Sequence, residues 1–255
     1  MDLLNLKTIF ITGTDTGVGK SIFSAVLALS LHHEGKKVCI SKPIQSGSPK
    51  DTDFLAELTG NKISVFNTYS FSLPAAPLVA AEYEKKEIDV KKIVSDIKSL
   101  EEKYDRVIVE GIGGIAVPIT RGVIPMNMGI QKMNDDDQKL DSRFCGNDIG
   151  ADPCKSYLIA DLIKDLNYPV VIVTRPSLGT INHSVLTIEF AKQKKLDVLG
   201  FVISGYDETL NDLAMKTAPN VISELTKVKC LMKTPKIKEL SFESVNLISK
   251  TIASK

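Results

Sequence analysis

The stretch that most restricts how this chain can fold is GTDTGVGKS, at residues 13–21. It follows an apolar run at residues 8–12 and precedes an apolar pattern of helical spacing that starts at residue 22. A strand, a glycine-containing loop that ends in Gly-Lys-Ser and a helix together predict a phosphate-binding loop, because free N–H groups at a helix start attract anions. The alternative is a glycine-rich turn without a ligand, and the two flanking elements argue against it.

The loop is a variant of the pattern G-x-x-x-x-G-K-[ST], because Thr14 stands where the first glycine is required. The last positions of the pattern are intact. We expect the backbone N–H groups of residues 17–21 to face phosphate oxygens, and Lys20 to reach the terminal phosphates. The Ser21 hydroxyl is expected to bind Mg²⁺.

Five runs rich in Val and Ile, at residues 8–12, 37–41, 106–110, 169–174 and 198–203, predict strands buried on both faces. Helical patterns are expected between them, at about residues 20–34, 52–59, 90–103, 156–166, 182–194 and 208–226. This alternation predicts a single P-loop NTPase-like α/β domain over residues 1–255, with a mostly parallel sheet and helices on both faces. Ligands of such sheets bind at the carboxyl ends of the strands.

Residues 123–155 break the alternation with an acidic run, several turn residues and no sustained periodicity. A structureless stretch of this length is unusual inside a compact domain. We therefore expect an insertion that forms a mobile or disordered loop.

Charge and cysteine content narrow the class of protein. The chain has 32 Lys and Arg against 31 Asp and Glu, so no overall basic field would attract nucleic acid or an anionic membrane. No apolar run reaches the ~18 residues of a membrane span, and the N-terminus lacks the features of a signal peptide. The four cysteines include no C-x-x-C pair. We expect a cytoplasmic protein with reduced thiols and neither nucleic-acid nor membrane partners.

Polar residues follow several of the predicted strands. Lys42 opens the hexapeptide KPIQSG and could neutralise charge during phosphoryl transfer, although a surface lysine at a turn remains the alternative. Glu110 ends the third run and is followed by Gly111 and Gly113, which suits a carboxylate near Mg²⁺ and a closely approaching ligand.

Two further segments are candidates for the site. Asp51 and Asp53 open a predicted helix and offer a second acid, or one of them is an N-cap. The segment LGTINH at residues 178–183 begins another helix and could hold a carboxylate on its N–H groups. His183 is better explained as structural than as catalytic.

The segments GTDTGVGKS, KPIQSG, DTDF, YSFSLPAAPLVAA, VEGIGGIAVPI and SLGTINHSVLT occur in this order. Together they resemble the dethiobiotin synthetase family over roughly residues 6–122 and 156–206. This family shares its fold with the ParA/MinD and cobyrinate-synthase groups, which usually carry a lysine early in the loop, where this chain has Thr14 and Asp15.

The resemblance implies an ATP-dependent ligase that converts 7,8-diaminononanoate and CO₂ to dethiobiotin, with Mg²⁺ as cofactor, in a homodimer. It implies that a carbamate attacks the γ-phosphate and that the resulting carbamic–phosphoric anhydride is closed by the second amine. The implied catalytic residues are Lys42, Lys20 and Thr16, and the implied metal ligands are Ser21, Asp53 and Glu110. The implied nucleotide contacts are Gly17, Val18, Gly19, Lys20, Ser21, Ile22, Asp53, Glu110, Gly111, Gly113, Ser204 and Gly205, and the substrate contacts are Thr16, Ser46, Gly179, Thr180, Ile181 and Asn182.

The chain departs from the family at the expected base-binding end. Ser204 stands where the family commonly has an asparagine that reads the adenine edge, and a hydroxyl offers fewer hydrogen bonds than an amide. The residues Thr234, Pro235 and Lys236 match the family's Ile-Pro-aromatic turn poorly. Weaker base selectivity is therefore predicted.

Three other interpretations stay open at this point. An amidoligase of the cobyrinate type would bring a glutaminase domain, of which the sequence has no sign. A nucleotide switch that positions partners on DNA or membrane would need the early-loop lysine and a basic or amphipathic terminal segment. A decayed, inactive copy is the third, given the insertion and the changes near Ser204.

Overall fold

The computed structural model describes residues 3–121, 156–210 and 212–253. The insertion predicted at residues 123–155 lies outside the described residues. Seven strands form one sheet in the order β11-β10-β9-β1-β6-β2-β4, and every neighbouring pair is parallel. Their bounds are Thr8–Gly13 (β1), Val38–Ser41 (β2), Ser64–Phe66 (β4), Arg106–Gly114 (β6), Val170–Thr174 (β9), Val198–Tyr206 (β10) and Cys230–Pro235 (β11).

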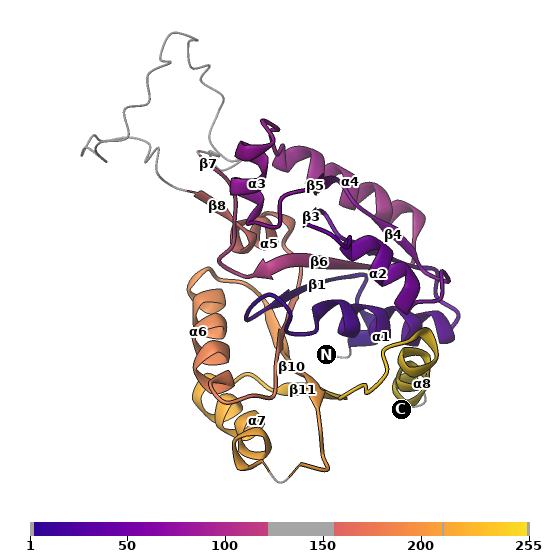
Figure 1. The fold of residues 1–255 in the computed structure, drawn as a ribbon, viewed down its shortest axis with the longest axis vertical. Coiled ribbons are helices and arrows are strands. Elements are labelled where there is room, and N and C mark those ends of the chain that lie inside the picture. Colours follow the sequence, from indigo (N-terminus) through magenta and orange to yellow (C-terminus); the bar gives the residue numbers. More distant parts are fainter. Residues whose placement is uncertain (1–2, 122–155, 211, 254–255) are drawn as a thin grey trace, which may run out of the picture.

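Helices cover both faces of this sheet, as Figure 1 shows. One face packs against α1 (Lys20–His33), α2 (Asp51–Leu58) and α8 (Phe242–Ala253). The other face packs against α4 (Val90–Lys103), α5 (Ile159–Leu166), α6 (Thr180–Gln193) and α7 (Leu213–Thr226). Short elements extend one end of the molecule (Figure 1), namely β3 (Ile44–Ser46), β5 (Tyr69–Phe71), α3 (Pro77–Tyr83), β7 (Pro118–Arg121) and β8 (Ser156–Leu158). The short helix η1 (Leu3–Asn5) precedes β1 and packs on the α1 side of the sheet.

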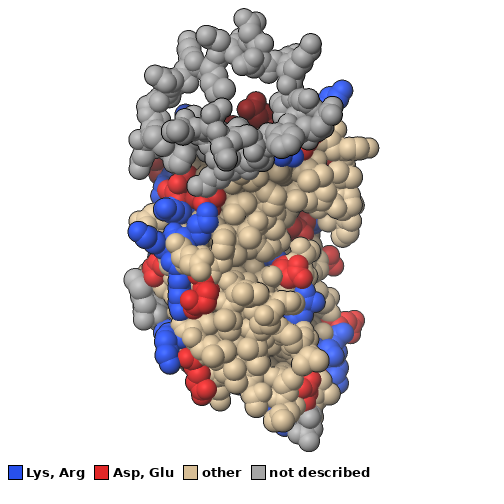
Figure 2. Space-filling model, turned by 90° about the vertical axis from the view of Figure 1, so that its left-hand side faces the viewer, with Lys and Arg blue, Asp and Glu red and all other residues tan. Residues whose placement is uncertain are grey.

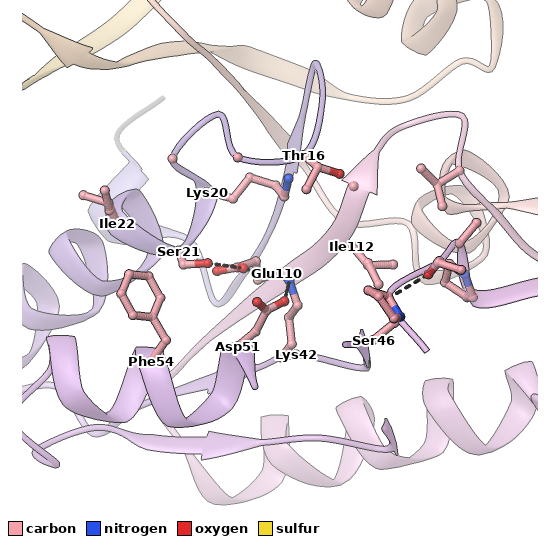
Figure 3. Close-up of a pocket in the computed structure, with 18 residues that line it drawn as sticks. Thr16, Lys20, Ser21, Ile22, Lys42, Ser46, Asp51, Phe54, Glu110 and Ile112 are labelled. Atoms are coloured by element: carbon pink, nitrogen blue, oxygen red, sulfur yellow. Dashed lines mark hydrogen bonds and ion pairs between the residues drawn. The ribbon is translucent and has the colours of Figure 1, made fainter. Parts of the chain in front are cut away.

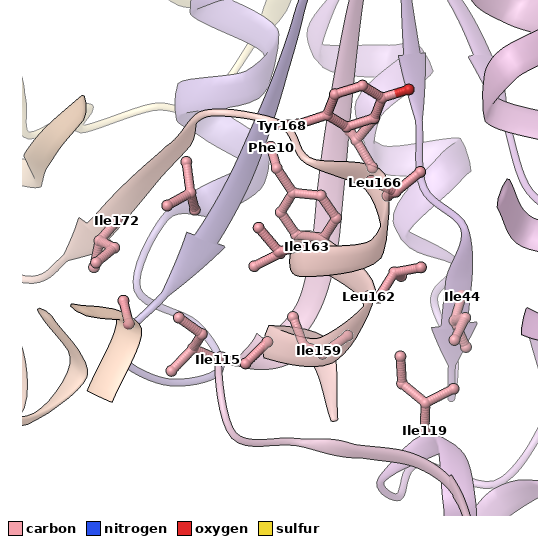
Figure 4. Close-up of a cluster of buried hydrophobic side chains, with 14 of the residues drawn as sticks. Phe10, Ile44, Ile115, Ile119, Ile159, Leu162, Ile163, Leu166, Tyr168 and Ile172 are labelled. Carbon is pink, nitrogen blue, oxygen red and sulfur yellow. The ribbon is translucent and has the colours of Figure 1, made fainter. Parts of the chain in front are cut away.

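The central strand β1 shows why the predicted runs lack alternation. Ile9 and Ile11 point into the core beneath α1, whereas Phe10 points into the opposite core, and all three are buried. Figure 4 shows Phe10 among side chains of α5 such as Ile163. Full burial of an apolar side chain of this size stabilises the fold by roughly 1.5–3 kcal/mol, so both faces of the strand contribute.

The predicted α/β class with a parallel sheet is confirmed, and the five predicted strands and six helices all appear within a few residues of their expected bounds. Residues 156–158 form β8 rather than the first turn of α5. The sequence does not predict β4, because three residues are too few to show a period. It does not predict β11 and α8 either, because the many lysines of the C-terminal part obscure their apolar pattern. The helix α3 was also not predicted. Within the described residues, no helix is long and apolar enough to cross a membrane.

Candidate active site

A cavity of about 650 Å³ opens where the carboxyl ends of β1, β2 and β6 meet. Figure 3 shows its lining side chains converging from the phosphate loop, from α2 and from β6. Most of the residues predicted for the site line this one cavity, namely Thr16, Gly17, Gly19, Lys20, Ser21, Ile22, Lys42, Ser46, Glu110 and Gly113. A parallel sheet brings these segments together because its strands all end at the same edge.

Lys20 begins α1 and is almost completely buried. Its Nζ donates a hydrogen bond to the backbone carbonyl of Asp15, at 2.9 Å. Burial, reinforced by the nearby positive charge of Lys42, lowers the pKa of Lys20 to about 8. Among the residues that the structure describes, no carboxylate forms an ion pair with Lys20, and a partly desolvated cation of this kind suits an incoming phosphate.

Lys42 follows β2 and has a different environment. Its Nζ lies 2.9 Å from Glu110 Oε1, 2.8 Å from Asp51 Oδ2 and 3.2 Å from the carbonyl oxygen of Gly111. Burial opposes the charge, but Glu110 and Asp51 outweigh it and hold the pKa of Lys42 above its ordinary value. Lys42 is therefore a fixed cation in a cluster of carboxylates rather than the surface lysine of the alternative interpretation.

Glu110 is completely buried, within β6 rather than at its end, opposite Ile11 of β1. Its Oε1 accepts hydrogen bonds from Ser21 Oγ at 2.8 Å and from Lys42 Nζ. Its Oε2 is buried and has no hydrogen-bond partner among the described residues. A buried carboxylate oxygen without a partner is costly unless a ligand or ion completes it.

The second acid of the cavity is Asp51, whereas Asp53 was the residue predicted. Asp51 lines the cavity, while Asp53 is exposed and lines a separate polar hollow. Helical geometry is the reason: Asp51, Phe54, Leu55 and Leu58 share the inward face of α2, and Asp53 points the other way. The spacing of the apolar residues 54, 55 and 58 after Asp51 was the sequence signal that identifies it.

These groups fit a hard divalent cation. The Ser21 hydroxyl, the Glu110 carboxylate and the Asp51 carboxylate are oxygen donors on one cavity. No group of three or more His, Cys, Asp or Glu side chains suited to a metal occurs in the described part of the chain. The site thus resembles one in which Mg²⁺ takes few protein ligands and completes its shell with phosphates and water.

The phosphate loop is shaped by its backbone. Gly19 has a φ of 96°, and a Cβ on it would lie 2.1 Å from Ser204 Oγ, so only glycine fits between the loop and β10. Asp15 ties the loop down: its Oδ1 accepts from the Thr16 N–H at 2.7 Å and its Oδ2 from Arg175 at 3.1 Å.

Several predicted residues do not line this cavity. Val18 is buried beneath the loop, Gly111 contributes only its carbonyl, and Ser204 touches the loop from behind. Gly205 is also absent from the cavity wall, as are the residues at the start of α6, Gly179, Thr180, Ile181 and Asn182. Thr180 is held inside the chain, because its hydroxyl is hydrogen-bonded to that of Thr174 at 2.8 Å.

An apolar wall was not predicted as part of the site. Ala75, Ala76 and Pro77 precede or begin α3, and they line the cavity together with Ile112 and Val117. The segment YSFSLPAAPLVAA pointed to this region only through its resemblance, because small apolar residues in a loop carry no chemical signal of their own. The wall provides a surface for an aliphatic group beside the charged cluster.

Comparisons with known proteins agree with this geometry. A family model described as an AAA domain matches residues 7–132 and 149–244. The chain is 35% identical to the ATP-dependent dethiobiotin synthetase BioD of Thermodesulfovibrio yellowstonii over 246 residues, which cover 92% of this chain and 91% of the relative. It is 32% identical to BioD of Bacillus subtilis strain 168 over 247 residues, covering 94% of this chain and 92% of that protein.

Solved structures show the same fold at low identity. A MinC:MinD cell division complex from Aquifex aeolicus matches with a TM-score of 0.55 and 12% identity, covering 98% of this chain and 96% of that chain. A ParA family ATPase from Chlorobium tepidum matches with a TM-score of 0.55 and 15% identity, covering 98% of this chain and 97% of the other.

The parallel sheet, the phosphate loop and the acid of β6 define a P-loop NTPase of the ParA/MinD architecture. Identity and coverage then single out one group within this class. The chain belongs to the dethiobiotin synthetase family.

Proposed function

We propose that this chain is a ligase that uses ATP to carboxylate and close 7,8-diaminononanoate to dethiobiotin. The observation that carries the proposal is one cavity that joins a phosphate loop, two buried lysines and an apolar wall. The phosphates would lie along the loop, and the aliphatic chain of the diamine would lie on Ala75, Ala76 and Val117.

In the proposed reaction one amine adds to CO₂ and loses a proton to solvent, which gives a carbamate. A carbamate oxygen attacks the γ-phosphorus of ATP, the bond to the β-phosphate breaks, and ADP leaves. The second amine then attacks the carbamate carbon and loses a proton, phosphate leaves and the ureido ring closes. Lys20 would neutralise the phosphates, and Lys42 and Thr16 would face the carbamate, so the chain acts mainly by alignment and charge stabilisation.

We also propose Mg²⁺ as the cofactor, held by Ser21 and Glu110 with Asp51 in place of the predicted Asp53. When bound, the ion would neutralise charge on the β- and γ-phosphates. The support is Glu110, whose Oε1 accepts from the Ser21 hydroxyl and whose buried Oε2 has no hydrogen-bond partner in the part of the chain that the structure describes.

A homodimer is proposed as well, with the start of α6 holding the carboxylate of the substrate in the partner's cavity. Gly179, Thr180, Ile181 and Asn182 do not line the cavity of their own chain. Leu178 and Leu186, before and within α6, are 90% and 63% exposed. Figure 2 shows that the face on the α6 side is mostly uncharged at its centre, which suits a protein interface. Sedimentation of the wild type and of Leu186→Glu tests this: the variant should be monomeric.

The catalytic proposal is tested by ATP hydrolysis with and without diaminononanoate and bicarbonate. We expect phosphate release to rise with the diamine, and one dethiobiotin to appear for each phosphate. A rate of ATP hydrolysis that does not change when the diamine is added would instead favour a nucleotide switch. No hydrolysis at all would favour an inactive copy.

A further inference from the structure

The ammonium group of Lys42 has no hydrogen left to offer. A lysine ammonium has three N–H donors. In this structure they have three acceptors within 3.2 Å: Asp51 Oδ2, Glu110 Oε1 and the Gly111 carbonyl. Lys42 is only 2% exposed, so solvent does not compete for these contacts. An anion that is to bind Lys42 must first displace one of the three acceptors.

Only one of the acceptors can leave without disturbing the sheet. The Gly111 carbonyl belongs to β6, and Glu110 is completely buried and also holds Ser21. Asp51 is the first residue of α2, and its side chain is 40% exposed. Within the described residues this side chain forms no hydrogen bond or ion pair apart from its contact with Lys42, so Asp51 is the member of the cluster that can move most easily.

The same cavity offers the Asp51 carboxylate a second binding partner, namely a divalent cation beside Glu110 and Ser21. Figure 3 shows the Asp51 carboxylate beside Lys42 and Glu110, with Ser21 on the other side of Glu110. The Oε2 atom of Glu110, which has no partner in the described residues, marks an incomplete set of oxygen ligands there. A divalent cation bound with the nucleotide attracts a nearby carboxylate more strongly than a lysine does, because it carries twice the charge.

We propose that Asp51 exchanges partners during the reaction cycle. In the empty site it pairs with Lys42; when the metal–nucleotide complex binds, it turns to the metal, and Lys42 gains a free N–H for the carbamate of the acceptor. Asp51 is thus a positioning residue that makes binding of the acceptor depend on prior binding of the metal–nucleotide complex. This inference rests on the proposed function, because it takes a carbamate as the ligand of Lys42.

The exchange has a thermodynamic consequence. In the empty site Lys42 is paired with Asp51 in most molecules. The apparent affinity for the acceptor is then the intrinsic affinity multiplied by the fraction of molecules in which Lys42 is free. The metal–nucleotide complex should then tighten acceptor binding, and linkage requires the acceptor to tighten nucleotide binding by the same factor. Removing the Asp51 charge should weaken its hold on Lys42 and reduce this dependence, because an amide oxygen binds an ammonium group less strongly than a carboxylate does.

The test is isothermal titration of the full-length protein with diaminononanoate in bicarbonate, with and without saturating Mg²⁺ and a β,γ-methylene analogue of ATP. We expect the wild type to bind the diamine about tenfold more tightly with the analogue, a typical coupling between sites. Asp51→Asn should bind the diamine more tightly than the wild type without the analogue, with a coupling below about threefold. Glu57→Gln, an exposed acid on the same helix that does not line the cavity, is the matched control and should behave as the wild type.

The outcomes separate the two proposals. A wild type that binds the analogue but never the diamine overturns the proposed function and the exchange with it. Diamine binding with the same coupling in Asp51→Asn and the wild type overturns the exchange alone. So does weaker diamine binding by Asp51→Asn without the analogue, since a gain in affinity is what a merely structural role cannot produce. Thermal unfolding of both variants and of Asp51→Ala verifies that each is folded.

Discussion

The loop after β1 and the end of β2 each place a buried lysine in the same cavity, and they do so by different means. The loop holds Lys20 by backbone geometry: a carbonyl contact at Asp15 and a glycine pressed against Ser204. The end of β2 holds Lys42 by charge, between Glu110 and Asp51. As a result, the pKa of Lys20 is lowered and that of Lys42 is raised.

The opposite pKa shifts indicate different roles for Lys20 and Lys42. In the empty protein burial disfavours the positive charge of Lys20. A bound phosphate would supply the missing counter-charge, so the free energy lost on burial would be regained on binding. Lys42 is stabilised already and has to be released from Asp51 before it can act. The loop after β1 thus presents a lysine that is available to an anion, whereas the end of β2 presents a lysine whose charge is already balanced by carboxylates. Replacing each lysine by methionine should therefore change stability in opposite directions.

The largest effect is expected for Lys42→Met. The variant leaves the completely buried Glu110 without its ion-pair partner. Breaking a buried pair in this way typically lowers the free energy of unfolding by about 3–5 kcal/mol. Urea denaturation at pH 7 measures the loss, and hydrolysis of ATP stimulated by diaminononanoate should disappear as well.

The double variant Lys42→Met with Glu110→Gln is the control for this prediction. Removing both charges should restore much of the stability but none of the activity. If Lys42→Met alone were as stable as the wild type, the charge cluster would not be what holds the end of β2.

Gly19→Ala probes the backbone of the loop region. The new alanine would have to adopt a φ of 96°, and its Cβ would lie 2.1 Å from Ser204 Oγ. Strain and overpacking together should cost roughly 2–4 kcal/mol of stability. Nucleotide binding, measured by titration with an ATP analogue, should weaken with it. Gly35→Ala, also at positive φ but with no atom near the new Cβ, is the control and should show the strain alone.

Lys20→Met should act in the opposite direction and stabilise the empty protein. The folded state lowers the pKa of Lys20 from 10.5 to about 8, so between these pH values the unfolded state binds more protons. Stability of the wild type therefore rises with pH across this window, and below pH 8 the unfavourable term is fully present. At pH 7 the variant should gain up to about 3 kcal/mol.

The gain of Lys20→Met should shrink as the pH is raised from 8 towards 10, while nucleotide binding is lost at every pH. Denaturation of the variant and the wild type in parallel at pH 7 and pH 10 follows this difference. A gain that stays constant with pH would mean that packing, and not charge, is responsible.

Most of the residues in this comparison could be predicted from the sequence. The strand runs, the Gly-Lys-Ser ending and the polar residues after the strands place Lys20, Ser21, Lys42 and Glu110 at one edge, because the carboxyl ends of parallel strands coincide. The choice between Asp51 and Asp53 depended on which face of α2 is buried. The three contacts of Lys42 depend on tertiary distances that no sequence pattern specifies, and so does the fit of Gly19 against Ser204.

The smallest expected effect concerns the base of the nucleotide, at the side where the loop meets β10. Ser204 is nearly buried and its hydroxyl lies against Gly19, so we expect it to form one hydrogen bond with a base. One such bond contributes about 0.5–1.5 kcal/mol, which corresponds to at most about tenfold discrimination. Competition of ATP against GTP and CTP for the same cavity should show preferences within this limit. A strict preference for ATP would show that other groups at the ends of β10 and β11 read the base, and would move the basis of selectivity away from Ser204.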